Sequence, residues 1–166
     1  MEKKFELTGN FVINAFGIKL FQIKCTKSFK YANEGDLGGY VEKEDNLSQY
    51  GDAWVSGDAQ VSGDARVYGD AQVSGDARVS GNAQVYGDAR VENDHMHCGF
   101  DCFGSCNRHT HAYKTKGNKV EITCGCFRGS LEEFEKKVEE THKGTIYEKQ
   151  YKAIINLIKI KFGIDG

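Results

Sequence analysis

The segment GDAWVSGDAQVSGDARVYGDAQVSGDARVSGNAQVYGDARV, residues 51–91, repeats a six-residue unit and decides the fold. Each unit reads Val-x-Gly-Asp-Ala-x, with Asn82 replacing Asp once; Val recurs from Val55 to Val91, and Ala from Ala53 to Ala89. A period of six fits neither a helix of 3.6 residues per turn nor one long strand. It predicts a short strand followed by a bend, with β-branched Val and small Ala pointing inward and Gly-Asp at each corner.

Three such units make one triangular coil of eighteen residues, the hexapeptide type of parallel β-helix, whose coils stack about 4.8 Å apart. The pattern extends toward the N-terminus with Leu37 on the Val position and with Val41 and Leu47 on the Ala position. We therefore expect a mainly β protein with a short parallel β-helix of about three coils. Its expected parts are an N-terminal β cap over residues 1–36, the β-helix over 37–95, and a C-terminal module over 96–166.

Aromatic residues recur on the outside of the expected coils. Eighteen-residue spacing places Tyr68 over Tyr86, and it places Trp54 in one column with Gln72 and Arg90. Tyr and Trp are common at protein interfaces, although stacking that stabilises a coil explains such a column equally well. Trp54, Tyr68 and Tyr86 are accordingly the candidate interface residues of a homo-oligomer, either a dimer or a trimer.

The charge distribution points to the C-terminal end. The chain has a formal net charge of −2 with 28% charged residues, which disfavours a nucleic-acid partner and a disordered acidic chain. Residues 95–166 carry twelve basic and nine acidic side chains, whereas residues 49–94 carry three and eight. An anionic partner is therefore expected at the C-terminal module. The first residues lack the apolar run of a signal peptide and no span of membrane length follows, so we expect a cytoplasmic protein with no membrane partner.

Cysteine and histidine concentrate just after the repeat. Five of the six Cys and four of the five His lie between His95 and Cys126. Gly117-Asn118 predicts a tight turn joining strands over 109–115 and 120–126. With a two-residue turn, His111 faces Cys124 and His109 faces Cys126, and all four lie on the apolar face of the hairpin.

Two interpretations of this cluster stay open. In a reducing compartment disulfides are rare, so the cysteines are expected as free thiols or metal ligands. Cysteine and histidine are the usual ligands of zinc. Alternatively, the cysteines are small buried apolar residues, the histidines are satisfied by hydrogen bonds, and no cofactor is required. The candidate zinc ligands are Cys98, Cys102, Cys106, His109, His111, Cys124 and Cys126.

Two helices follow the expected hairpin. Ser130 and Glu133 match a capping box, and Leu131, Phe134 and Val138 then recur at helical spacing. After a break at Lys143-Gly144, a second apolar stripe begins with Tyr147 and Tyr151 and continues through Ile154, Ile155, Ile158 and Phe162. We expect both stripes to pack as a cap.

Two segments carry a resemblance to known proteins. EGDLGGYVEKEDNLSQYGDAWV (residues 34–55) and ITCGCFRGSLEEFEKKVEETH (122–142) resemble hexapeptide-repeat left-handed β-helix proteins of phage, prophage and bacterial genomes. The more specific part is CGCFRG, Cys124 to Gly129, together with Thr141-His142. The resemblance implies a left-handed coil. Some of these proteins are labelled acyltransferases on the strength of the repeat, and many have no assigned function.

The preferred functional hypothesis is a non-catalytic oligomeric binding protein of phage type. Its basic C-terminal module would capture a small anionic ligand, such as a defence signalling nucleotide, or inhibit a host defence protein. The candidate contacts are cations and hydrogen-bond donors suited to a phosphate or carboxylate, namely Arg108, His109, Thr110, Lys114, Arg128 and His142.

Two alternatives are kept. Acyltransferases with this repeat use a His as base, but here every His follows the repeat and no loop interrupts it. The other alternative is a structural, virion-associated β-helix, against which the expected caps at both ends argue. No catalytic residue is assigned in either case.

Overall fold

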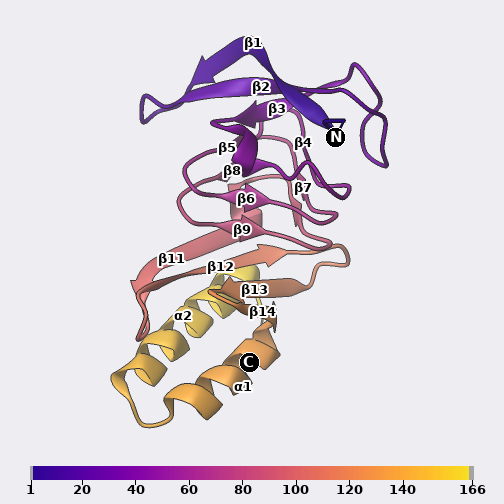
Figure 1. Cartoon of the computed structure of the whole chain (residues 1–166). Coiled ribbons are helices and arrows are strands. Elements are labelled where there is room, and N and C mark those ends of the chain that lie inside the picture. The colour runs from indigo at the N-terminus through magenta and orange to yellow at the C-terminus, as the bar shows by residue number, and fades with distance from the viewer. Residues whose placement is uncertain (1, 165–166) are drawn as a thin grey trace. The chain divides into compact units, whose positions relative to one another are not determined.

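The structure is a computed structural model that describes residues 2–164 and divides into two compact units, Met1–Asp94 and His95–Gly166 (Figure 1). The expected N-terminal cap and the repeat thus belong to one unit. The C-terminal unit begins one residue before the boundary expected from the end of the repeat.

The N-terminal segment forms antiparallel strands. Strands β1 (Phe5–Ile13), β2 (Lys19–Cys25) and β3 (Leu37–Val41) pair antiparallel, and β3 then pairs parallel with the first ladder of the repeat. In Figure 1 the β1–β2 hairpin lies across the end of the coils. Phe5, Leu20 and Ile23 are fully buried. They cover the apolar residues that an open coil end would expose to water.

The repeat folds into stacked coils of 18 residues. Parallel ladders join residues 18 apart, as in the series Val55, Val73 and Val91. The seven repeat valines from Val55 to Val91 have no exposed surface, and the repeat alanines have 3% at most. The inward phase of Val and Ala is confirmed. The strands are β4 (Trp54–Val55), β5 (Gln60–Val61), β6 (Arg66–Val67), β7 (Gln72–Val73), β8 (Arg78–Val79), β9 (Gln84–Val85) and β10 (Arg90–Val91).

The first coil departs from this period, and the phase expected for it was wrong. Val41 pairs with Val61 and Leu47 with Val67, so both occupy Val positions, 20 residues before their partners. Leu37 is 56% exposed and occupies no inward position. The reason is that the corner between Leu47 and Val55 carries two residues more than the later corners. A short 3-10 helix, η1 (Glu44–Asn46), precedes this corner.

The C-terminal unit is a four-stranded antiparallel sheet with two helices on one face (Figure 1). After η2 (Asp94–Met96) come β11 (His97–Phe103), β12 (Arg108–Lys114), β13 (Val120–Cys124) and β14 (Phe127–Ser130), then α1 (Leu131–His142) and α2 (Ile146–Phe162). The capping box of Ser130 and Glu133 is confirmed. Strands β11 and β14 were not anticipated from the sequence. Within the described residues, neither helix combines the length and apolar character needed to cross a membrane.

The register predicted for the hairpin was wrong by one residue. The Thr115 N–H donates to the Lys119 carbonyl at 2.9 Å, so the loop has three residues, with Gly117 and Asn118 both at positive φ. Thr110 therefore pairs with Cys124, and His111 pairs with Thr123. A slip of one residue moves every side chain to the opposite face. Cys124 therefore faces the helices, while His109 and His111 lie on the other face of the sheet.

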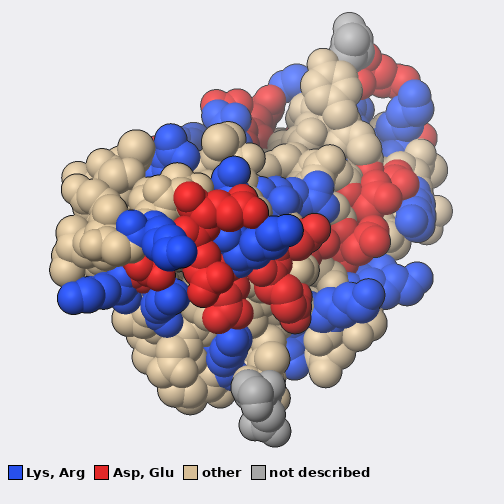
Figure 2. Space-filling view, turned by 90° about the horizontal axis from the view of Figure 1, so that it is seen from below, with Lys and Arg blue, Asp and Glu red and all other residues tan. Residues whose placement is uncertain are grey.

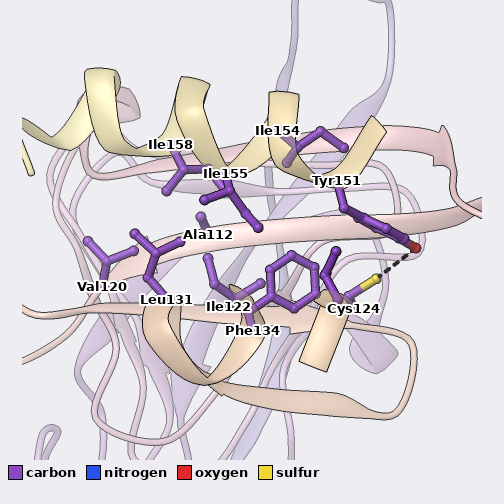
Figure 3. Packing of buried hydrophobic residues seen from close by; sticks show 11 residues of the cluster. Ala112, Val120, Ile122, Cys124, Leu131, Phe134, Tyr151, Ile154, Ile155 and Ile158 are labelled. Atoms are coloured by element: carbon purple, nitrogen blue, oxygen red, sulfur yellow. Dashed lines mark hydrogen bonds between the residues drawn. The ribbon is translucent and has the colours of Figure 1, made fainter. Parts of the chain in front are cut away.

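The apolar core of the C-terminal unit lies between the sheet and the helices (Figure 3). Ala112, Ile122 and Cys124 from the sheet meet Phe134 and Tyr151 from the helices. The Phe134 ring is perpendicular to the Tyr151 ring at 5.6 Å between centroids, a favoured aromatic geometry. This core fixes the position of Tyr151.

Candidate functional site

Most of the cations expected to bind an anion are paired within the C-terminal unit. Arg128 forms an ion pair with Glu121, with Nη2 and Oε2 3.3 Å apart. Lys114 Nζ donates to Asn118 Oδ1 in its own hairpin loop at 2.7 Å. His109 Nδ1 lies 2.6 Å from Asp101 Oδ1. Thr110 is fully buried, and its hydroxyl donates to Cys124 Sγ at 3.3 Å. These four residues do not gather at one surface.

The candidate zinc ligands are not brought together either. The corrected register puts His109 and His111 on the sheet face opposite Cys124, and His111 Nε2 lies 3.0 Å from His97 Nδ1. Cys102, Cys106 and Cys126 are exposed. Burial raises the pKa of the Cys98 thiol to about 11, which disfavours the thiolate that zinc binds. Among the residues described, no three His, Cys, Asp or Glu side chains are placed to hold a metal ion.

Two of the expected contacts, His142 and Arg108, both act on the Tyr151 side chain, the first by ring stacking and the second electrostatically. The His142 ring stacks on the Tyr151 ring, with 5.4 Å between centroids and 29° between planes. At the far end of the same ring, the Tyr151 hydroxyl lies 3.7 Å from Cys124 Sγ (Figure 3). Arg108 is close enough to act on this hydroxyl electrostatically. We call Arg108, Cys124, Gly125, His142 and Tyr151 the Tyr151 cluster.

Glycines make room for the cluster. A Cβ on Gly125 would lie 2.5 Å from Arg108 Nη1, so the guanidinium runs over backbone where no side chain stands. A Cβ on Gly104 would collide with the Tyr151 hydroxyl, and the Gly104 N–H is held by Gln150 Oε1 at 3.0 Å. Both glycines have positive φ, a conformation that other residues rarely adopt. The close approach of Arg108 and Tyr151 to the backbone therefore depends on glycine at these two positions.

Electrostatics make the cluster suitable for holding an anion and unsuitable as a base. Burial, assisted by the contact with Cys124, raises the pKa of the Tyr151 hydroxyl well above its usual value, and Arg108 opposes this only in part. The phenol therefore stays protonated at neutral pH. Arg108 is an exposed residue. A guanidinium donates two parallel hydrogen bonds to a phosphate or a carboxylate.

The surface of the two helices does not form a broad basic field. Figure 2 shows Asp and Glu interleaved with Lys and Arg over the face seen there. Ion pairs of Lys152 with Glu148 and of Lys159 with Glu135 connect charges along and between α1 and α2. On this face, an attraction for an anion would therefore have to come from a local group and not from a broad field.

Tyr151 is the residue that sequence reasoning missed. It stands in the apolar stripe of α2 and was assigned only to packing. A signal was present, because a buried tyrosine needs a partner for its hydroxyl, whereas leucine or phenylalanine at that position needs none.

The expected interface residues on the coils have different surroundings. Trp54 is 5% exposed, with its ring 5.4 Å from the Phe29 ring, so the N-terminal segment covers it. Tyr68 and Tyr86 are neighbours in the predicted column, with ring centroids 4.4 Å apart. Tyr68 and Tyr86 therefore stay candidates for a subunit contact, while Trp54 is occupied within the chain.

Comparison with known proteins bears on the coils alone. A family model described as the YdcK beta solenoid repeat matches residues 59–73, 71–83 and 83–95. No curated protein matches the chain. The Tyr151 cluster lies outside the matched segments. The coils of this chain are thus similar to the YdcK beta solenoid repeat and carry a β-solenoid repeat.

Proposed function

We propose that this protein is a non-catalytic binding protein that captures a small anionic ligand at Arg108. One observation carries the proposal: an exposed guanidinium is seated on the backbone of Gly125, beside the buried Tyr151 that also stacks His142. A guanidinium held against the backbone loses less side-chain entropy on binding than a fully solvated one. Its N–H donors are therefore already positioned to bind an oxyanion.

The ligand class follows from these groups. Arg108 would bind a phosphate or carboxylate group through two hydrogen bonds. His142, on the face of the Tyr151 ring, would add a second positive charge when protonated. A small phosphate-bearing molecule such as a signalling nucleotide fits this pair better than a neutral ligand. Because Tyr151 stays protonated, it would steady the cluster without removing a proton from the ligand.

The wider setting of the proposal comes from the sequence. We propose that the coils form a left-handed β-helix of about three turns. They would serve a phage-type protein that acts in the host cytoplasm and assembles as a dimer or trimer. The protein could also inhibit a host defence protein. Arg108 would then bind a carboxylate or phosphate group on the surface of that protein.

The test is a binding measurement with matched arginine variants. Native mass spectrometry of freshly purified protein would first detect a retained ligand and the subunit number. Calorimetry would then use inorganic pyrophosphate and a panel of cyclic and linear nucleotides. We expect Arg108→Ala to weaken binding at least about tenfold, the loss of a charge-assisted pair. Arg128→Ala, which removes a paired arginine of the same unit, should leave the affinity within about twofold.

Two outcomes would count against the proposal. One is a ligand-free mass spectrum combined with no saturable binding of any anion in the panel. The other is equal affinity of the wild type and Arg108→Ala. Consumption of an acyl thioester by the protein, lost in His142→Ala, would instead favour the acyltransferase alternative.

A further inference from the structure

We propose a second binding site in the N-terminal unit, a groove on the first coil that takes a neutral saccharide. The groove has a volume of about 610 Å³. This lies within the usual range of small-molecule sites, about 300–1,000 Å³. We call it the solenoid groove. Its lining residues are Glu44, Asp45, Leu47, Ser48, Gln49, Tyr50, Arg66, Val67, Tyr68 and Gln84.

The groove exists because the first coil has the longer corner. Leu47 is stacked on Val67, but Val55 follows eight residues later where later corners take six. The additional chain puts Tyr50 outside the coil, with 68% of its surface exposed. The two extra residues thus build one wall of the groove.

This wall is fixed by hydrogen bonds to the N-terminal strand. Gln49 Oε1 accepts from the Lys4 N–H at 2.8 Å, and Gln49 Nε2 donates to the Phe5 carbonyl at 3.2 Å. On the other side of Leu47, the buried Asn46 donates to the carbonyls of Gly63 and Ala65. The corner is therefore held at both ends and does not depend on a ligand for its shape.

The floor and the opposite wall are also formed in advance. Leu47 and Val67 lie beneath the groove and are almost completely buried, so they support its base and offer a ligand almost no surface. The Tyr68 ring packs on the Tyr86 ring, and its hydroxyl donates to Gln84 Oε1 at 3.0 Å. The groove thus combines an exposed ring and a fixed ring with polar groups at its rim.

The polar groups suit a ligand with many hydroxyls. The carboxylates of Glu44 and Asp45 accept hydrogen bonds, Arg66 donates them, and Ser48 does both. A pyranose ring offers hydroxyls of both kinds around its edge and a C–H face that packs on an aromatic ring such as Tyr50. Planar polar groups beside an exposed ring would leave few hydroxyls of a bound sugar without a partner. Selectivity would arise because a ligand that leaves these groups unpaired loses binding energy.

The charges around the groove disfavour anionic and cationic ligands. Two carboxylates at the rim, in a unit with ten basic and fifteen acidic residues over 1–94, repel an anion. Arg66 at the same rim disfavours a cation. Lys3 holds Glu44 at 2.7 Å and neutralises part of the acidic charge. Among neutral ligands, the match of rim groups and exposed ring to hydroxyls and a C–H face favours a mono- or disaccharide. This site is independent of the anion site proposed at Arg108.

Saturation-transfer NMR of the whole protein against a panel of neutral mono- and disaccharides tests this inference. We expect saturable transfer from at least one sugar. Tyr50→Ala and Asp45→Asn should each weaken it at least about tenfold, since the first removes the exposed ring and the second replaces a charged acceptor by a neutral amide. Phe16→Ala is the matched control, because Phe16 is an aromatic residue 88% exposed and outside the groove. That control and Arg108→Ala should bind the sugar as the wild type does.

The inference is overturned if no sugar in the panel gives saturable transfer. It is also overturned if Tyr50→Ala and Asp45→Asn both bind like the wild type. A third adverse result is a change in subunit number for Tyr50→Ala without any sugar binding, because the groove would then be a contact between copies of the chain. None of these results bears on anion binding at Arg108, which the calorimetry measures separately.

Discussion

Glycines have different neighbours in the two units of this protein. In the coils, glycine corners pack on backbone atoms of the next coil, as Gly75 does on the Glu92 carbonyl. In the C-terminal unit, Gly104 and Gly125 instead make room for the side chains of Tyr151 and Arg108. The first kind of contact sets the spacing of a regular stack. The second makes room for particular side chains, so glycine serves regular stacking in the coils and local space around Tyr151 and Arg108 in the C-terminal unit.

The largest expected effect is at a coil corner. In Gly75→Ala, the new Cβ would collide with the Glu92 carbonyl, which cannot move without disturbing the coil. The residue would also be strained, because Gly75 has a φ of 61°. We expect a loss of about 2–5 kcal/mol in the free energy of unfolding. Gly81→Ala is the control, since it has φ 66° and open space, and it should lose about 1–2 kcal/mol. Urea denaturation of both variants measures the difference, and equal losses would refute packing between coils at this corner.

A smaller loss is expected at the glycine beneath Tyr151. Gly104→Ala combines backbone strain with a clash against the Tyr151 hydroxyl, but a side chain can shift where a backbone carbonyl cannot. We expect about 2–3 kcal/mol. Gly117→Ala, with φ 90° and open space, should lose about 1–2 kcal/mol through strain alone. If Gly104→Ala unfolds at the same urea concentration as Gly117→Ala, the glycine does not support the cluster.

We expect the stability of the N-terminal unit to depend on pH through Lys4. Its ammonium donates to the Gly51 and Ala53 carbonyls, and burial lowers its pKa from 10.5 to about 8. Between these values the unfolded chain binds more protons than the folded one, so stability should rise from pH 8 to about 10.5 and stay flat below. Because solvent screens a partly hydrated ammonium, we expect a rise of about 1 kcal/mol.

The control for Lys4 is Lys4→Met. That variant should be less stable than the wild type at pH 7, because two carbonyls lose their donor. The difference between the two proteins should then widen as the pH rises from 8 to 10.5. A constant difference across this range, measured by thermal unfolding, would show that the Lys4 pKa is unchanged by folding.

The smallest effect is expected at the Arg128–Glu121 pair. Both side chains are partly exposed, and exposed ion pairs contribute about 0–1 kcal/mol. At low salt, the free energy of unfolding of Arg128→Ala should therefore lie within about 1 kcal/mol of the wild-type value. The difference should be smaller at 1 M salt. A loss above about 2 kcal/mol would mean that this pair supports the sheet more than its exposure suggests.

Repetition explains why the coils were predictable. If one Val were wrongly assigned to the inside of the coil, the same error would have to recur at the other six. The inward Val and Ala and the Tyr68–Tyr86 column could therefore be predicted from the spacing alone. The first coil was mispredicted where repetition fails, since two additional residues before Val55 shift the phase of Leu47 and Val41. The sequence contains no second copy of that corner against which to check it.

The C-terminal unit lacks this redundancy. The register of its hairpin depends on whether one loop contains two or three residues, and Gly117-Asn118 is compatible with both. That single difference separated the His and Cys residues onto opposite faces. In the Tyr151 cluster, Arg108 and His142 were predicted as cations, but their meeting at Tyr151 depends on the packing of α2 against the sheet. No local pattern encodes such a contact.

An NMR titration of the isotopically labelled full chain with inorganic pyrophosphate tests the central claim most directly. If Arg108 of the Tyr151 cluster binds the anion, backbone amide signals of Arg108, Gly125, Cys126 and His142 should shift in a saturable manner. Signals of the repeat over 55–91 should stay in place, and Arg108→Ala should abolish the shifts. Saturable shifts confined to the coils, or identical shifts in Arg108→Ala, would contradict the account.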